Sequence, residues 1–394
     1  MEHSFNHPLM RNFSFQSPTK IIYGLYSLER LKDELKKMSY KNALLVTGSN
    51  VCKTPGCSKI KEALGVNGSF VEFNKVCPEP DTKVLAELAM LVRKDPPDLV
   101  VGLGGGSSMD MSKIASALTV NEKDPVSYFK GEPLIRKGPP IMTIPTIAGT
   151  GSEVTPFSIV VEQNKKLATS HYSLYPTVAV VDPTLSLSAS PQSTASAGID
   201  ALCHGIESIM SVDSNPVCNA LAFDAISNVD DYFERAYCNG DDIEARNGLS
   251  MASVLSGMAF TNTGLCLAHG IAYTYAMSHA LPHGTSVALA EPYALEFNTP
   301  AIPEKIELIA AAMGIDTSCM STAEVGYECA SRIVELLETT HQPQTLDELN
   351  MDECEIEPMV DDLLANQKRF VNKNPRKPSR EELIGLYERM FEDL

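Results

Sequence analysis

The chain has 394 residues, of which 44% are hydrophobic and 21% are charged, so it is long enough for two domains with large apolar cores and has the composition of a soluble globular protein. Its formal net charge of −18 disfavours nucleic-acid partners, because the protein would repel phosphate groups. The chain begins without a signal-peptide pattern, contains no apolar run long enough to cross a membrane, and has ten cysteines but no Cys-x-x-Cys pair, so we expect a cytoplasmic protein with no membrane partner.

The first half of the chain alternates short β-branched runs with amphipathic segments. Residues 1–12 are expected to be a flexible N-terminal extension. Strands are predicted at residues 43–47, 69–73, 98–102, 140–144 and 177–181, and an amphipathic helix is predicted at residues 81–93. This alternation predicts an α/β domain with a parallel sheet covered by helices over residues 13–183.

The composition changes after Asp182-Pro183, which is expected to form a turn at a domain boundary. Continuous β-branched runs disappear, and Ala, Leu, Met and Glu dominate at helical spacing. Residues 184–394 are therefore predicted to form an all-α domain.

A glycine-rich segment, Val100-Val-Gly-Leu-Gly-Gly-Gly-Ser-Ser-Met-Asp110, leads from a buried strand into a helix. Gly104, Gly105 and Gly106 allow the backbone to approach a bulky anion, and Ser107 and Ser108 are expected to cap the helix. Free N–H groups at that helix start would then face a phosphate group. The spacing is neither the usual Gly-x-Gly-x-x-Gly nor a Walker loop, and a purely structural glycine turn explains the segment equally well.

A second loop, Thr146-Ile-Ala-Gly-Thr-Gly-Ser-Glu153, follows the next predicted strand. It offers the hydroxyl groups of Thr146, Thr150 and Ser152 at the carboxyl end of a strand, where open α/β sheets bind ligands. A single loop of this kind is usually only a connection. Two on successive strands predict one dinucleotide-binding site.

Four residues of the predicted helical domain have the chemistry of metal ligands. Asp200 and His204 are four residues apart and share one helix face, while His269 and His283 are each followed by glycine. Three imidazoles and one carboxylate suit Fe²⁺ or Zn²⁺, with intrinsic affinity favouring zinc and availability favouring iron. Taken alone, packed or solvated histidines and a chance Asp/His pair explain the pattern more often than a metal does.

Several motifs in the same order resemble the iron-containing (group III) alcohol dehydrogenase family over about residues 13–391. They are Gly104-Gly-Gly-Ser-Ser-Met-Asp110, Ala148-Gly-Thr-Gly-Ser-Glu-Val-Thr155, Val178-Ala-Val-Val-Asp-Pro183, Gly198-Ile-Asp-Ala-Leu-Cys-His-Gly-Ile-Glu207, His269-Gly, Pro282-His-Gly284 and Asn374-Pro-Arg376. The resemblance implies an N-terminal dinucleotide-binding domain, a helical C-terminal domain and a cleft between them. It implies interconversion of a small primary alcohol and its aldehyde by an NAD(P)(H)-dependent homodimer or larger assembly.

The resemblance also assigns roles to individual residues. It implies that Asp200, His204, His269 and His283 hold the metal, Fe²⁺ before Zn²⁺. It places the pyrophosphate at Gly104 to Ser108 and the nicotinamide near Thr146, Thr150 and Ser152. Lys166 matches a lysine that reaches the cofactor ribose, and Asp110 is expected in the same pocket, although a first-turn helix acid would also explain it.

Two departures from the family pattern bear on chemistry. Tyr273 stands where many members have a further histidine, so a tyrosine proton relay is one hypothesis and core packing is the other. His279 is expected to assist proton exchange, with His171 a weaker candidate. Gly48 stands where many NAD-preferring members have an aspartate, which leaves Ser49, Asn50 and Lys53 free to contact a 2′-phosphate and favours NADP(H) over NAD(H).

Three other readings remain open. A glycerol dehydrogenase-like enzyme or a sugar-phosphate cyclase of the dehydroquinate synthase type would share this architecture, but the cyclase needs more basic residues near the metal. A non-catalytic metal or nucleotide sensor would bind cofactor without turnover. Substrates with a phosphonate or sulfonate group also stay open, because a single basic residue from elsewhere in the fold would suffice.

Overall fold

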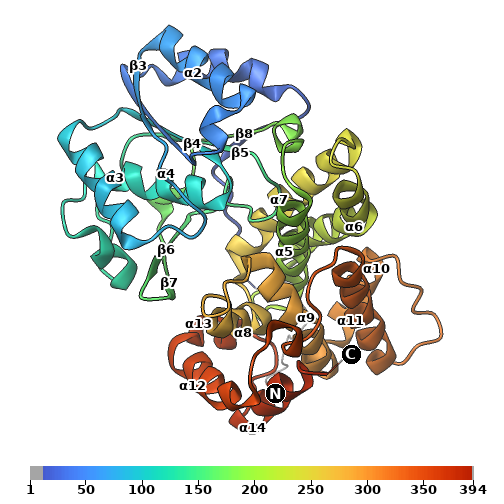
Figure 1. The fold of residues 1–394 in the computed structure, drawn as a ribbon. Helices are drawn as coiled ribbons and strands as arrows, with labels where there is room; N and C mark the ends of the chain where they lie inside the picture. Colours follow the sequence, from blue (N-terminus) through green and yellow to red (C-terminus); the bar gives the residue numbers. More distant parts are fainter. Residues whose placement is uncertain (1–11, 393–394) are drawn as a thin grey trace. The chain divides into compact units, whose positions relative to one another are not determined.

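The computed structural model describes residues 12–392, which form two compact units. One unit is Ser17–Ala189, and the other joins the described residues before Ser17 to the chain from Ser190 onward (Figure 1). The units divide a few residues beyond Pro183, where the composition changes. The expected flexible extension lies, apart from Asn12, outside the described residues.

The first unit is built on a six-stranded sheet whose strand order is β1-β8-β5-β4-β2-β3. In that order the strands are Lys20–Tyr23, Val178–Val181, Ile141–Pro145, Leu99–Gly104, Asn42–Thr47 and Ser69–Phe73. Every neighbouring pair is parallel. The strands therefore end on one edge of the sheet, which brings the loops that follow β2, β4 and β5 together.

Helices cover both faces of this sheet, as the alternation of side chains requires. Ala43 and Leu45 pack with α1 (Leu31–Met38) and α2 (Pro55–Asn67). Leu44 and Val46 point the other way and pack with α3 (Thr82–Lys94) and α4 (Gly106–Leu118). The predicted parallel sheet with helical cover is confirmed (Figure 1).

Two features of this unit were not predicted from the sequence. One is the edge strand β1, which pairs with β8. The other is the antiparallel hairpin of β6 (Phe157–Glu162) and β7 (Lys165–Ser170). Its turn places Gln163 at φ 50° and Asn164 at φ 59°, the left-handed pair that a two-residue hairpin requires. The turn contains no glycine, so the usual sequence signal of a two-residue hairpin is absent.

The second unit is helical, as predicted. Its helices are α5 (Pro191–Met210), α6 (Pro216–Cys238), α7 (Ile243–Thr263), α8 (Leu267–Tyr275), α9 (His283–Asn298), α10 (Pro303–Ala312), α11 (Thr322–Thr339), α12 (Ile356–Asn366), α13 (Lys368–Lys373) and α14 (Arg380–Arg389). Helix α5 contacts α6, α7 and α9 and is buried along most of its length. It is therefore the central helix of the unit (Figure 1).

The Asn374-Pro-Arg376 motif fastens the C-terminal segment to the end of α9. The amide groups of Asn374 and Asn298 donate to each other's oxygens over 2.7 and 2.9 Å. Arg376 lies 4.0 Å above the ring of Phe297 and donates to its carbonyl oxygen. The motif thus serves the packing of this unit.

Within the described chain, no single helix is both long and apolar enough to span a membrane. The pair α7 and α8, bent by 100° at its break, passes the same test on length and composition only.

Candidate functional site

A cluster of potential metal ligands lies in the helical unit. Asp200 is in the middle of α5, His269 is near the start of α8, and His283 is the first residue of α9. One ligand atom from each lies within 4.8 Å of the others. Nε2 of His269 is buried and has no hydrogen-bond partner among residues 12–392. A divalent ion fits this donor set, because it would satisfy a buried nitrogen that is otherwise costly to leave unbonded.

His204 adjoins this cluster of three. Its Nε2 lies 3.6 Å from Oδ1 of Asp200, one helical turn away. Its ring stacks on His269 at 5.0 Å between centroids and on Phe260 at 4.4 Å. The structure thus brings three of the four predicted ligands together and places His204 beside them, between the ring of Phe260 and that of His269.

Glu207, which the sequence analysis did not single out, holds His269 in place. Its Oε2 accepts the Nδ1–H of His269 over 2.5 Å, and its Oε1 accepts the backbone N–H of the same residue over 3.2 Å. This arrangement fixes the tautomer that leaves Nε2 free to bind a metal. A usable signal was present: Glu207 is seven residues after Asp200 and shares its helix face.

Gly284 allows the close approach of α9 to α5 that brings His283 next to Asp200. A Cβ atom at this position would lie 1.8 Å from the carbonyl oxygen of Ser196 and 2.7 Å from Cβ of Asp200. No side chain fits there unless the helices separate. The glycine after His283 is therefore needed for the helix contact that forms the candidate metal centre.

Behind the ligands, α5 and α9 bury groups that cannot easily carry charge. Glu291 is fully buried, and neither of its carboxyl oxygens has a hydrogen-bond partner in the described part of the chain. Burial, with a smaller contribution from the charge of Glu207, raises the pKa of Glu291 well above its usual value. Burial likewise raises the thiol pKa of Cys203 and Cys266, so neither has the character of a reactive thiolate.

Aromatic side chains form a wall beside the ligands. The ring of Tyr273 meets His283 edge-on at 5.8 Å, and Phe370 lies 6.1 Å from His269. Tyr273, one of the two predicted catalytic residues, therefore lies beside the candidate metal centre. The other, His279, turns its Nε2 toward Glu355 at 3.7 Å and its Nδ1 toward Ser278.

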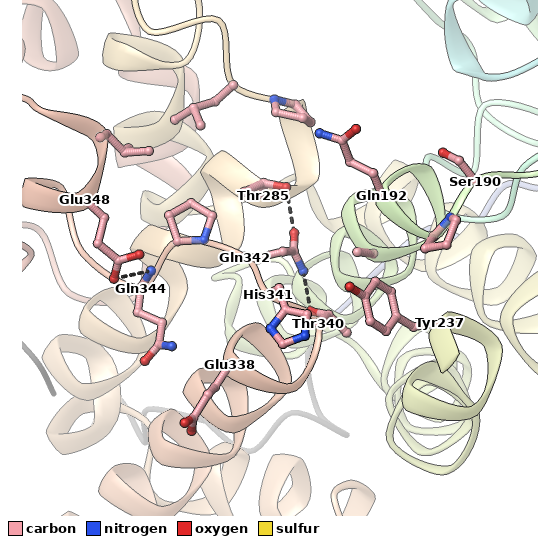
Figure 2. A pocket seen from close by; sticks show the side chains of 16 residues that line it. Ser190, Gln192, Tyr237, Thr285, Glu338, Thr340, His341, Gln342, Gln344 and Glu348 are labelled. Carbon is pink, nitrogen blue, oxygen red and sulfur yellow. Dashed lines mark hydrogen bonds between the residues drawn. The ribbon is translucent and has the colours of Figure 1, made fainter. Parts of the chain in front are cut away.

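A separate cavity of about 930 Å³ lies elsewhere in the helical unit (Figure 2). Figure 2 shows Tyr237 on its wall and a hydrogen-bonded chain in which Gln342 connects Thr285 to Thr340. None of the four predicted metal ligands lines this cavity. It is thus distinct from the metal centre, although Thr285 is close to His283 in sequence.

In the α/β unit, the two predicted glycine loops pack against each other. Gly104 has φ 142°, which favours glycine, and its carbonyl oxygen accepts a hydrogen bond from the backbone N–H of Thr146 over 3.0 Å. A Cβ on Gly106 would lie 3.0 Å from the side chain of Thr150. The loops after β4 and β5 therefore form one continuous surface at the end of the sheet.

The start of α4 differs from the expectation in one respect. Ser107 and Ser108 lie inside the first turn, while Gly105 is the N-cap and no side chain caps it. The prediction that these serines cap the helix is wrong, since the glycine backbone already supplies the turn. Ser107 instead accepts the backbone N–H of Glu79 over 3.2 Å, and Glu79 pairs with Lys166 at 2.5 Å.

A buried polar cluster lies behind the second loop, centred on Lys113, which the sequence analysis missed. Lys113 is completely buried and donates to Ser152 (2.6 Å), Asp110 (3.1 Å) and the carbonyl oxygen of Phe157 (2.9 Å). Ser152 also donates to Asp110 over 2.5 Å. Desolvation lowers the pKa of Lys113, opposed by the nearby Asp110. The cluster fixes the loop that carries Ser152.

Gly48 directly follows β2 and packs closely against the loop that contains Val76. A Cβ at this position would lie 2.9 Å from the carbonyl oxygen of Val76. Ser49 and Asn50 follow and are exposed. A cavity of about 610 Å³ opens nearby, and Val51, Leu103 and Leu185 are among the residues that line it.

A parallel sheet carrying paired glycine loops, together with a helical unit carrying a nitrogen and oxygen ligand cluster, suits a metal-dependent, dinucleotide-linked enzyme. Residues 18–183 match the family model described as "Iron-containing alcohol dehydrogenase". Residues 194–391 match "Fe-containing alcohol dehydrogenase family, C-terminal". The chain therefore belongs to the iron-containing alcohol dehydrogenase family. It is a metal-dependent, NAD-linked enzyme that interconverts a small alcohol and its aldehyde.

Relatives span nearly the whole chain. It is 31% identical to "Long-chain-alcohol dehydrogenase 1" of Geobacillus thermodenitrificans, covering 93% of this chain and 94% of that protein. It is 32% identical to "Choline dehydrogenase" of Bacillus subtilis, covering 96% and 95%. The solved structure of sulfoacetaldehyde reductase from Bifidobacterium kashiwanohense in complex with NAD⁺ is 28% identical and superposes with a TM-score of 0.87, covering 96% of this chain and 99% of that one.

Proposed function

We propose that this chain carries out its alcohol and aldehyde interconversion at an Fe²⁺ ion held by Asp200, His204, His269 and His283, with NADP(H) as the preferred cofactor. The observation that carries the metal assignment is the buried ligand cluster, in which Glu207 orients His269 toward Asp200 and His283. The alternative ion is Zn²⁺, which takes the same donors.

The chemistry divides between the bound groups and the protein. A divalent ion at this site supplies Lewis acidity toward the substrate oxygen, and the nicotinamide donates or accepts the hydride. Phe260 and Phe370 pack against His204 and His269, and they are proposed to help exclude water from the reacting atoms. The hydroxyl group of Tyr273 is proposed to exchange a proton with solvent at this wall, and His279 is proposed to assist farther out.

The cofactor is proposed to follow the end of the parallel sheet. Gly104, Gly105 and Gly106 offer backbone N–H groups at the start of α4 for the pyrophosphate. Thr146, Thr150 and Ser152 lie on the adjoining loop for the nicotinamide side, Asp110 and Lys113 hold that loop, and Lys166 contacts the ribose. The cavity lined in part by Val51 and Leu185 is proposed to take the adenine.

Activity measured anaerobically tests the assignment of reaction and metal together. Metal-free protein is mixed with NADPH or NADH and a panel of short aldehydes, with Fe²⁺, Zn²⁺ or a chelator added. We expect metal-dependent oxidation of the cofactor, abolished by chelator and highest with Fe²⁺. Higher rates with zinc would overturn the iron assignment. Absence of turnover with any metal, although metal and cofactor bind, would favour a sensor.

The preference for NADP(H) is tested by Asn50→Asp, which adds a charge without adding volume. A carboxylate beside a 2′-phosphate costs about 1–2 kcal/mol, so we expect kcat/KM for NADPH to fall roughly fivefold to thirtyfold while the value for NADH changes little. The exposed Ser69→Asp is the matched control. Equal losses with both cofactors would contradict the placement of the 2′-phosphate.

The chain is further proposed to be a cytoplasmic homodimer or larger assembly. The family resemblance supports the oligomer, and the ten cysteines, all free thiols, suit a reducing compartment.

A further inference from the structure

The relatives of this chain do not identify its substrate. The substrates in their names include an uncharged long-chain alcohol, the cation choline and the anion sulfoacetaldehyde. The residues of this chain beside the metal centre must decide. Among them, Arg369 stands out as a charged side chain on an otherwise aromatic wall.

Arg369 is the second residue of α13 and stacks on both rings of that wall. Its guanidinium carbon lies 4.5 Å from the centroid of Phe370 and 5.2 Å from that of Tyr273. These are the two rings that contact His269 and His283. The guanidinium therefore packs on the same two rings that contact the predicted metal ligands.

The N–H groups of Arg369 are not engaged by other residues of the described chain. Within residues 12–392 it forms no ion pair and no hydrogen bond, whereas nearby basic side chains are engaged: Lys373 pairs with Asp213, and Arg376 pairs with Glu382. Stacking occupies the face of a guanidinium but leaves the N–H groups of its edge available. Arg369 is exposed, so those donors can reach a ligand from solvent.

A stacked guanidinium with free donors suits a planar or tetrahedral anion. The two rings restrict the side chain before a ligand arrives, which lowers the entropy lost on binding. Its N–H groups can bind a carboxylate or sulfonate through two parallel hydrogen bonds. A positively charged group at the same place would be repelled and would lose its hydration without compensation.

We propose that Arg369 binds the anionic end of the substrate, so that the preferred substrates are short aldehydes with a terminal carboxylate or sulfonate and the corresponding hydroxy acids. This inference rests on the proposed function of the metal centre. The hydride of the reduced nicotinamide goes to the aldehyde carbon, a solvent proton goes to its oxygen, and the products are the alcohol and the oxidised cofactor. The anionic group takes no part in bond changes and serves to position the substrate.

The test compares Arg369→Gln with the wild-type enzyme on two anionic probes, 4-oxobutanoate and sulfoacetaldehyde, and on neutral pentanal. A hydrogen-bonded charge pair is worth about 1.5–3 kcal/mol, so the ratio of kcat/KM for anionic to neutral aldehyde should fall roughly 10- to 100-fold, mainly through KM. Arg369→Lys should restore part of it. Lys368→Gln, on the neighbouring exposed residue, should leave the ratio unchanged.

A binding measurement separates this inference from the proposed reaction. Calorimetry with the metal-loaded protein compares 4-hydroxybutanoate with 1-butanol and does not require turnover. Tighter binding of 4-hydroxybutanoate by the wild type than by Arg369→Gln supports the inference even if no aldehyde is reduced, which would be a failure of the proposed function alone. Equal binding by both proteins, or a wild-type preference for pentanal over both anionic probes, overturns the role of Arg369.

Discussion

Replacing Glu207 by glutamine should lower the affinity of the protein for its metal about 10- to 100-fold, the usual effect of removing a partner that orients a ligand. The carboxylate accepts both N–H groups of His269 and so keeps Nε2 directed at the cluster. A glutamine has one acceptor oxygen and one donor group. Its NH₂ group would oppose the Nδ1–H of His269 and favour the wrong tautomer.

Titration of the metal-free protein with Fe²⁺ under anaerobic conditions would measure this change. Activity should recover in part at high metal concentration, because the four ligands remain. Glu388→Gln, on the exposed face of α14, is the matched control. An unchanged metal affinity in a correctly folded Glu207→Gln protein would show that the hydrogen bond does not tune the ligand.

Replacing Lys113 by methionine should destabilise the α/β unit by about 3–5 kcal/mol, the cost of breaking a buried ion pair by removing one partner. The substitution keeps the volume of the side chain but removes every hydrogen bond that its ammonium group donates. Asp110 would remain buried next to Ser152 without its counter-charge. The loop that carries Ser152 should loosen as a consequence.

Denaturant unfolding would measure the loss of stability. Nucleotide affinity would show whether the loop that carries Ser152 has loosened. The double variant Lys113→Met with Asp110→Asn should be less destabilised than the sum of the single variants, with a coupling of about 0.5–3 kcal/mol. Lys137→Met, at an exposed position, should have little effect. If the losses of stability of the two single variants simply add in the double variant, Lys113 and Asp110 do not stabilise each other.

The fold could be predicted from the sequence in those elements whose residue pattern fits only one kind of structure. Strands β2, β4 and β5 are buried on both faces and read as continuous apolar runs, so they were found with their ends shifted by one or two residues. The short β1 has no such run and is defined by pairing with β8. Its existence depends on a partner more than 150 residues away in the chain, which local patterns do not reveal.

The candidate site likewise contains some residues that could be predicted from the sequence and others that could not. The histidines and the aspartate of the candidate metal site could be singled out because imidazole and carboxylate groups have metal-binding chemistry of their own. Glu207, Lys113 and Arg369 act through contacts with residues that are distant in sequence, such as His269 for Glu207 and Tyr273 for Arg369. A lysine in a helix or an arginine near the C-terminus is ordinary until the fold shows what it touches.

Gly284 also has a consequence for efforts to change the substrate range of this enzyme. Because the backbones of α5 and α9 meet at this residue, with a hypothetical Cβ only 1.8 Å from a carbonyl oxygen, randomising it would yield almost no folded metal-binding variants. Phe260, Tyr273, Arg369 and Phe370 are different, since each projects a side chain at the metal centre or its wall. A mutant library aimed at new substrates should vary these four positions and keep Gly284 unchanged.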